Sequence, residues 1–433
     1  MSGEWENVEL GDVANVRSGY AFKSSDWTDA GIPVVKIANV KSGRLEMQGC
    51  SHVDEETAAR AGDFQLSAGD VLIAMTGYIG EVALVRDADL PCVLNQRVGK
   101  FDVRDDERLD SGYLFAVLTS REMRETIESL GYGSAQPNVS PSLIQEVEFP
   151  LPPLPEQRRI AKILGDLDDK IELNRKMNET LEQMARALFK SWFIDFDPVR
   201  AKMEGRTPTG MDAATAALFP DRLVDSELGL IPEGWEVKAL EEVVDIARQS
   251  INPAAQPFDL FAHYSLPAFD TGRVPVRQRG DEIKSNKLLL TNGSVLISKL
   301  NPHIPRVWLP TLDPTEISVC STEFIVAIAS PSSSKEYLYC LFCSDDFQQT
   351  YQGLATGTTG SHQRIQAESL LSLLQVLPHG EVVSVFTSKM KSMVTAINQN
   401  IHQSRTLSTL RDTLLPKLVS GEVRVGETQV SNQ

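Results

Sequence analysis

Two loops rich in glycine and serine carry the polar side chains best suited to recognising another molecule. One loop, GSAQPN, contains Gln136 and Asn138, and the other, TGSHQR, contains Gln363 and Arg364. Amide side chains can form paired hydrogen bonds with the edge of adenine, and a guanidinium can do so with guanine. We therefore predict that both loops approach DNA bases. The alternative is that each glutamine only caps a local turn.

Further candidate contacts lie on turns and strand ends between apolar runs. They are Tyr20, Lys23, Lys36, Gln96 and Arg97 in the first half, and Arg277, Arg279, Lys299, His303 and Arg306 in the second half. Lysine and arginine suit phosphate oxygens, and arginine also suits guanine. Tyr20 stands near Phe22 and is alternatively a core aromatic residue. We predict that these side chains contribute to a DNA-binding surface.

Charge is distributed unevenly along the chain. The formal net charge of −17 argues against a uniformly basic nucleic-acid protein. From Thr271 to Arg306, however, seven basic residues stand against two acidic ones, a local surplus of +5, and a smaller surplus lies between Arg17 and Arg44. Because whole-chain charge averages over surfaces with different tasks, these segments are candidate DNA-facing surfaces. The alternative is that they are solvated faces without a partner.

The sequence lacks the motifs that would carry catalysis or hold a metal. It contains no GxxxxGK[ST] phosphate loop and no HExxH zinc motif. Its nearest approach to an Asn-Pro-Pro-aromatic methyltransferase loop is Asn301-Pro302-His303. Cys340 and Cys343 form a single CxxC without a second ligand pair, so we predict two apolar residues on a buried helix face. We expect a non-catalytic chain with no metal site and no cofactor of its own.

The sequence also bears on the cellular compartment. No apolar run is long enough to span a bilayer, and the acidic start MSGEWENVEL does not resemble a signal peptide. Five cysteines, an odd number, do not suggest a disulfide framework. We therefore expect a cytoplasmic protein without a membrane partner.

The two halves of the chain repeat one plan. Recurring pairs run in order along both halves: Trp5 and Trp235, Gly69–Ile73 and Gly293–Ile297, Tyr113 and Tyr337, and Gln136 and Gln363. Each half starts with short β-branched runs broken by turns, with helices expected at 111–130 and 335–353. A proline-marked boundary follows, and then a long helical pattern begins.

This repeated order predicts an α+β fold. Two duplicated, mixed α/β domains are separated by two long antiparallel helices, which form a coiled coil about a pseudo-twofold axis. The predicted boundaries are 1–150 and 226–375 for the domains, 151–225 and 376–425 for the helical regions, and 426–433 for a tail.

Each long helical pattern has a heptad seam. The apolar positions are Ile160, Leu164, Leu167, Ile171, Leu181, Ala185 and Leu188 in the first helix, and Phe386, Met390, Met393, Ile397, Leu407 and Leu414 in the second. Polar residues interrupt both seams at equivalent places, namely Asn174, Asn178, Asn400 and Ser404. We hypothesise that these polar layers fix the helix register. The alternative is that they are hydrated or contact a partner subunit.

The length of the first seam suggests a spacer. The segment from Ile160 to Leu188 would span about 42 Å as a helix. One turn of B-DNA is roughly 34–36 Å, the separation at which two readers meet the same face of the duplex. The helices could therefore hold two unlike domains over two unlike half-sites.

Four stretches carry a resemblance to a known family. They are PLPPLPEQRRIAKILGDLDDKIELNRKMNETLEQMARALFKSWF, the junction DSELGLIPEGW, the strand motif GDVLIAMTGYIGEVALV and the loop GYGSAQPNVS. Together with the two unlike domains, they resemble the specificity subunit of a type I restriction-modification system. The second helix departs from the family pattern, since LPHGEVVSVFTSKM replaces the usual LPEQ-type opening.

The resemblance implies a function and a set of partners. Each target-recognition domain would read one half of a bipartite double-stranded DNA site. Two methyltransferase subunits and two restriction-translocase subunits would join the complex. S-adenosylmethionine, ATP and Mg²⁺ would then belong to those partners. The alternatives are a duplicated coiled-coil scaffold that does not bind DNA and the specificity half of a single-chain enzyme.

Overall fold

The structure, a computed structural model, divides into two compact units. It describes residues 5–41, 43–131, 138–356 and 363–425. Unit 1 comprises Met1–Asn174 and His402–Gln433, and unit 2 comprises Arg175–Ile401. The predicted domain boundaries stay predictions, because the two units divide the chain inside its long helices.

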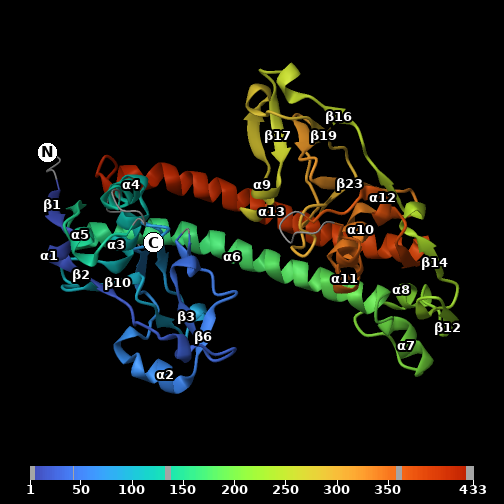
Figure 1. Cartoon of the computed structure of the whole chain (residues 1–433), viewed down its shortest axis with the longest axis horizontal. Helices are drawn as coiled ribbons and strands as arrows, with labels where there is room; N and C mark the ends of the chain where they lie inside the picture. The colour runs from blue at the N-terminus through green and yellow to red at the C-terminus, as the bar shows by residue number, and fades with distance from the viewer. Residues whose placement is uncertain (1–4, 42, 132–137, 357–362, 426–433) are drawn as a thin grey trace, which may run out of the picture. The chain divides into compact units, whose positions relative to one another are not determined.

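Both units contain a mixed α/β domain and segments of the two long helices (Figure 1). These helices are α6 (Leu154–Phe193) and α13 (Gly380–Val419), of 40 residues each. The predicted α+β class with two long helices is confirmed. No described helix is long and apolar enough to cross a membrane.

The domain of unit 1 is built on a four-stranded antiparallel sheet in the order β2-β10-β7-β8. Its strands are β2 (Ala14–Ser18), β10 (Val98–Val103), β7 (Val71–Ala74) and β8 (Val82–Leu84). The flanking strands are β1 (Glu6–Glu9) paired with β11 (Glu148–Leu151), β4 (Val40–Lys41) paired with β5 (Arg44–Leu45), and the sheet of β6 (Ser51–Val53), β3 (Ile32–Val35) and β9 (Val93–Leu94). The helices are α1 (Leu10–Val13), α2 (Glu55–Arg60), α3 (Ser111–Thr119), α4 (Arg121–Leu130) and α5 (Pro141–Gln145).

The domain of unit 2 repeats this plan with a larger flanking sheet. Its four-stranded sheet has the order β15 (Val244–Ile246), β23 (Phe324–Ala329), β20 (Ser294–Ser298) and β21 (Val307–Trp308). The five-stranded flanking sheet has the order β16 (Ser250–Ile251), β19 (Lys287–Leu289), β22 (Ile317–Cys320), β17 (Leu260–Tyr264) and β18 (Val276–Arg279). Two further pairs are β14 (Glu236–Ala239) with β24 (Leu374–Leu377), and β12 (Leu223–Ser226) with β13 (Gly229–Pro232). The helices are α7 (Asp197–Met203), α8 (Ala213–Ala217), α9 (Leu266–Asp270), α10 (Lys335–Cys343), α11 (Asp345–Gly353) and α12 (Ala367–Leu371).

The central sheets repeat each other in register. Val16 lies opposite Phe101 in unit 1, and Ile246 lies opposite Ala327 in unit 2. The strands at the start and end of each domain pair in the same way, with Glu9 opposite Glu148 and Ala239 opposite Leu374. The duplication that the sequence predicts is therefore present in the backbone pairing.

The continuous apolar run of β7 has a direct explanation in the packing. Val71 and Ile73 point into one core, together with Tyr113 and Leu114 of α3. Leu72 and Ala74 point into a second core on the opposite face. Side chains of a strand alternate between faces, so a sheet that is buried on both sides needs apolar residues at every position.

The short helices expected at 111–130 and 335–353 are present, and each range contains a pair of helices. Ser120 separates α3 from α4, and Ser344 separates α10 from α11. Both serines have extended backbone angles and accept a hydrogen bond from a backbone N–H three residues later. A serine in this role caps a new helix, which ends the preceding one.

Segments of α6 and α13 run antiparallel in each unit. In unit 1, Asn174 Nδ2 donates to Gln403 Oε1 at 3.0 Å and to Ser404 Oγ at 3.2 Å. In unit 2, Asn400 Nδ2 donates to Asn178 Oδ1 at 2.8 Å. The predicted polar positions thus meet across the helix pair, while their role in fixing the register stays a prediction.

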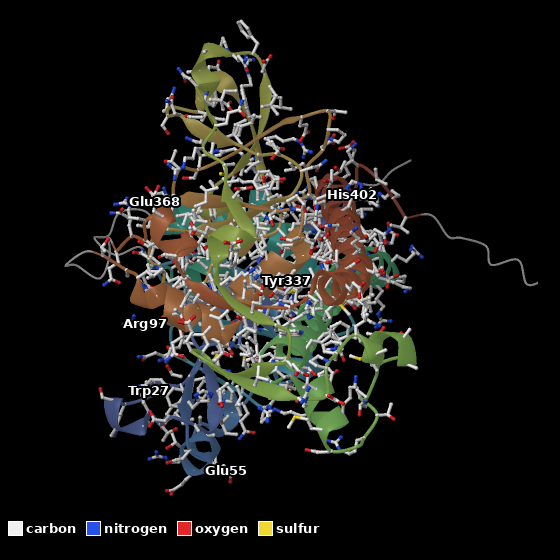
Figure 2. The ribbon with its side chains drawn as sticks, turned by 90° about the vertical axis from the view of Figure 1, so that its right-hand side faces the viewer. Trp27, Glu55, Arg97, Tyr337, Glu368 and His402 are labelled. Atoms are coloured by element: carbon white, nitrogen blue, oxygen red, sulfur yellow. The ribbon has the colours of Figure 1, made fainter. Side chains whose placement is uncertain are left out.

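An aromatic cluster fills the core of unit 2 between α6, α10 and α13. Phe386 of α13 packs against Phe193 of α6, with ring centroids 5.1 Å apart, and against Phe189 at 5.8 Å. Tyr337 of α10, labelled in Figure 2, is 2% exposed and lies 5.2 Å from the Phe193 ring. Aromatic rings bury large apolar areas, so this cluster joins the helices to the domain within unit 2.

Candidate nucleic-acid interface

Three segments of unit 1 meet at one end of its central sheet. The backbone N–H of Met75, just beyond β7, donates to the carbonyl of Arg97 at 3.3 Å, and the N–H of Val139 donates to the carbonyl of Met75 at 2.9 Å. Thr76 Oγ1 donates to Asn138 Oδ1 at 3.0 Å. The described end of the predicted loop thus lies beside the turn that carries Arg97.

We define the unit 1 recognition edge as five residues of these segments: Thr76, Tyr78, Gln96, Arg97 and Asn138. Gln96, Arg97 (labelled in Figure 2) and Asn138 are exposed. Among the described residues, Arg97 has no ion-pair partner. Three predicted candidates therefore share one surface, and their side chains offer one guanidinium and two carboxamides.

Tyr78 and Thr76 are recognition-edge residues that the sequence analysis missed. Tyr78 is 61% exposed and stands between Gly77 and Gly80, which have φ angles of 73° and 84°. Glycine adopts such left-handed angles without strain, so the turn can present its aromatic side chain to solvent. The signal in the sequence is an aromatic residue between two glycines directly after a fully apolar strand.

Unit 2 has the same backbone arrangement at the equivalent place. The N–H of Lys299 donates to the carbonyl of Glu323 at 2.8 Å, and the N–H of Ile365 donates to the carbonyl of Lys299 at 3.1 Å. Asn301, with a φ of 50°, occupies the left-handed position that Gly77 holds in unit 1. We call Lys299, Leu300, Glu323, Gln363 and Arg364 the unit 2 recognition edge.

The loops correspond with a shift of one residue from the predicted alignment. The bridge of Thr76 with Asn138 in unit 1 matches the bridge of Leu300 with Arg364 in unit 2, so Asn138 and Arg364 are equivalent. Gln136, which the prediction matches to Gln363, lies outside the described residues, so its role stays a prediction.

Several predicted DNA contacts in unit 2 form ion pairs within the unit. Arg306 Nε and Nη2 donate to the Asp270 carboxylate at 2.7 and 2.9 Å, and its side chain is only 12% exposed. Arg277 Nε donates to Glu316 at 2.6 Å. Arg279 lies 3.5 Å from Asp281 and over the ring of the exposed Phe258. Acids outside the basic segment thus offset much of its local surplus, and a role of these arginines in DNA binding stays a prediction.

Two predicted DNA contacts, Lys36 and Tyr20, pack against other side chains of unit 1. Lys36 Nζ donates to Ser51 Oγ at 2.7 Å and lies 3.7 Å from the centre of the Trp27 ring. Burial lowers the pKa of Lys36. The Tyr20 ring lies 4.9 Å from the Phe22 ring, in the packing around the small flanking sheet. These contacts suit the core alternative for Tyr20, although its backbone carbonyl accepts a hydrogen bond from the N–H of Gln96.

The remaining candidates differ in exposure. Lys23 and His303 are exposed, whereas Lys299 is half-buried. Lys23 lies outside the recognition edge, on the turn that leads into the 3-10 helix Ser24–Asp26. The structure thus brings only a part of the predicted set together.

Cys340 and Cys343 of α10 lie in the core of unit 2. Cys340 is buried, and Cys343 is half-buried. Burial raises the pKa of Cys343 to about 11 and the pKa of Cys340 well above its usual range. The described residues include no group of three His, Cys, Asp or Glu side chains that could hold a metal. Uncharged thiols of this kind act as small apolar residues.

Comparison with known proteins finds that the chain is similar to one family. Residues 2–183 match the family model of the type I restriction modification DNA specificity domain. The chain is 27% identical to the MjaIX type I restriction enzyme specificity subunit of Methanocaldococcus jannaschii, over 98% of this chain and 94% of that protein. It is 24% identical to the HindI specificity subunit of Haemophilus influenzae, over 72% of this chain and 77% of that protein.

A solved structure shares the fold. The crystal structure of a type I restriction-modification S subunit from M. genitalium matches with a TM-score of 0.59 and 14% identity, over 97% of both chains. The resemblance to the specificity subunits of type I restriction-modification systems that the sequence indicates is confirmed.

Proposed function

We propose that this chain binds a bipartite, asymmetric DNA site and directs a methyltransferase and a restriction enzyme to it. The pair of recognition edges is the observation that carries this proposal. Their backbones pair in the same way, yet Asn138 and Arg97 in unit 1 stand where Arg364 and Glu323 stand in unit 2. Different polar groups on one repeated frame suit two different half-sites.

The long helices serve as the spacer in this proposal. Their polar layers, Asn174 with Ser404 and Asn178 with Asn400, lie in an otherwise largely apolar seam. A polar layer pairs best with another polar layer, so sliding by one heptad would place these amides opposite apolar side chains. A fixed register would give a fixed distance between the half-sites.

The partners in this proposal are two methyltransferase subunits and two restriction-translocase subunits. The chain itself reads DNA without catalysing a reaction, and S-adenosylmethionine, ATP and Mg²⁺ belong to the partners. Exposed apolar residues on α6 support a docking role, since Met177 and Met184 are 43% and 52% exposed and stand seven positions apart. Residues at that spacing share one helix face.

Sequencing of the methylated bases in the host genome tests the function. Deletion of the gene should abolish one split, asymmetric adenine-methylation motif, and a plasmid copy should restore it. A duplicated scaffold that does not bind DNA would leave every motif in place. In a gel-shift assay with the methyltransferase subunit, affinity for a duplex with the motif should fall steeply with salt, because phosphate contacts release counterions.

A further inference from the structure

The unit 2 recognition edge contains an arginine held by a carboxylate. Arg364 Nε donates to Glu323 Oε2, and Arg364 Nη2 donates to Glu323 Oε1, both at 3.1 Å. The Arg364 side chain is 50% exposed, and that of Glu323 is 30% exposed. The backbone of both residues is tied to Lys299 and Leu300 at the end of β20. The Glu323 carboxylate therefore orients the guanidinium, and the Arg364 side chain is still half exposed.

Among the described residues, only Glu323 bonds to the guanidinium of Arg364, and it contacts one edge. A guanidinium has five N–H donors, and the Glu323 carboxylate takes one from Nε and one from Nη2. The outer N–H groups of Nη1 and Nη2 then form a parallel pair that points away from the carboxylate. Guanine presents two acceptors, N7 and O6, at the matching spacing in the major groove. Orientation before binding also lowers the entropy lost on binding.

We propose that Arg364 contacts a guanine in one half-site and that Glu323 is the positioning residue for its guanidinium. This inference rests on the proposed function and adds a base and two residues to it. Unit 1 places its guanidinium differently, on Arg97 at the position equivalent to Glu323. Each recognition edge thus carries one arginine, but the two arginines stand at different positions of the repeated frame. This difference suits half-sites of different sequence.

The test uses the complex of the full chain with its methyltransferase subunit and a library of double-stranded DNA with randomised positions. The wild-type complex should select a bipartite motif. Arg364→Gln should reduce the preference for one G·C pair in one half-site by roughly 5- to 100-fold and leave the other positions unchanged. Arg364→Lys should do the same, because lysine keeps the charge but lacks the planar fork. Glu323→Gln should weaken the same preference by a smaller factor.

A matched control comes from another arginine–glutamate fork in unit 2. Arg222 Nη2 and Nε donate to Glu233 at 2.7 and 3.1 Å, next to β12 and β13. Arg222→Gln should leave the selected motif unchanged. Thermal melting of each variant checks that the fold is intact, and Arg364→Lys keeps the test valid if Arg364→Gln does not fold.

Three outcomes would overturn the inference. Equal weakening for all sequences would make Arg364 a phosphate contact, and an unchanged motif would make the ion pair a structural tie. Loss of the guanine preference in Arg364→Gln but not in Glu323→Gln would remove the positioning role of Glu323. If the wild-type complex selects no motif, the proposed function itself fails.

Discussion

Unit 1 and unit 2 agree in their central sheets and differ in the sheets beside them. The flanking sheet has three strands in unit 1 and five in unit 2. An isolated bridge of Gln65 with Val93 stands in unit 1 where β19 pairs with β22, through Leu289 and Val319, in unit 2. The backbone groups at a sheet edge are unpaired, so a further strand can pair there. The flanking sheet can therefore gain strands without changes to the buried strands of the central sheet.

The helix layers show a second difference between the units. Arg411 Nη1 of α13 donates to Asp168 Oδ1 of α6 at 2.7 Å in unit 1. The equivalent layer in unit 2 consists of Val394 and Ala185, which pack in the aromatic core. The repeat therefore preserves backbone geometry. Whether a helix layer is charged or apolar depends on the core that packs against it.

The largest expected effect is on the core of unit 2. Phe386→Ala should lower the free energy of unfolding by about 3–5 kcal/mol, because it removes a fully buried ring from the cluster. Its counterpart in unit 1 is the fully buried Ile160, and Ile160→Val should cost only about 0.5–1.5 kcal/mol. Chemical denaturation measures both, and hydrogen exchange shows which unit opens. A cost of Phe386→Ala well below about 3 kcal/mol would mean that the aromatic cluster adds little to the stability of unit 2.

A smaller effect is expected at the turn that carries Arg97. A methyl group on Gly19 would lie 2.5 Å from the Leu94 carbonyl oxygen and 2.6 Å from that of Asn95. Gly19→Ala should therefore cost about 1–3 kcal/mol through overpacking. It should also shift Gln96 and Arg97 and weaken the preference of one half-site, as read from the methylation motif. Effects on both half-sites would contradict the independence of the units.

The polar layer in unit 2 tests the register. Asn178→Leu alone should cost about 0.5–1.5 kcal/mol, since it removes the partly buried hydrogen bond with Asn400. Asn178→Leu combined with Asn400→Leu should recover most of that stability and loosen the register. Methylation mapping would then show a second spacer length between the half-sites. An unchanged spacer in the double variant refutes the register role.

Removal of the ion pair between Asp168 and Arg411 in unit 1 should have the smallest effect on stability. Asp168→Ala should cost about 1 kcal/mol or less, and less still at high salt, because both side chains are partly exposed. Asp168→Val with Arg411→Ala copies the unit 2 layer and should be close to neutral. Thermal melting at low and high salt checks both variants. A large loss in the double variant would show that the ion pair is essential to unit 1.

The sequence alone predicts the parts of this fold that depend on local pattern. The heptad spacing locates both long helices, and the asparagines in the seam predict where polar side chains meet. Partners that are distant along the chain are not readable in this way. Arg306 is neutralised by Asp270, 36 positions away, and Glu323 meets Arg364 across 41 positions. Only the folded sheet brings such residues together, so the basic surplus and the recognition edges could not be judged from spacing.

The first and last strands of each domain have one more consequence. Glu6 lies opposite Leu151, and Glu236 lies opposite Leu377. The chain thus enters and leaves each domain through a single two-stranded ribbon. A segment whose ends are adjacent can be replaced by another of different length without disturbing what flanks it. Recombination between two such genes, in the regions that encode these ribbons, would exchange one whole domain. The resulting protein would combine two existing half-site preferences in a new bipartite site.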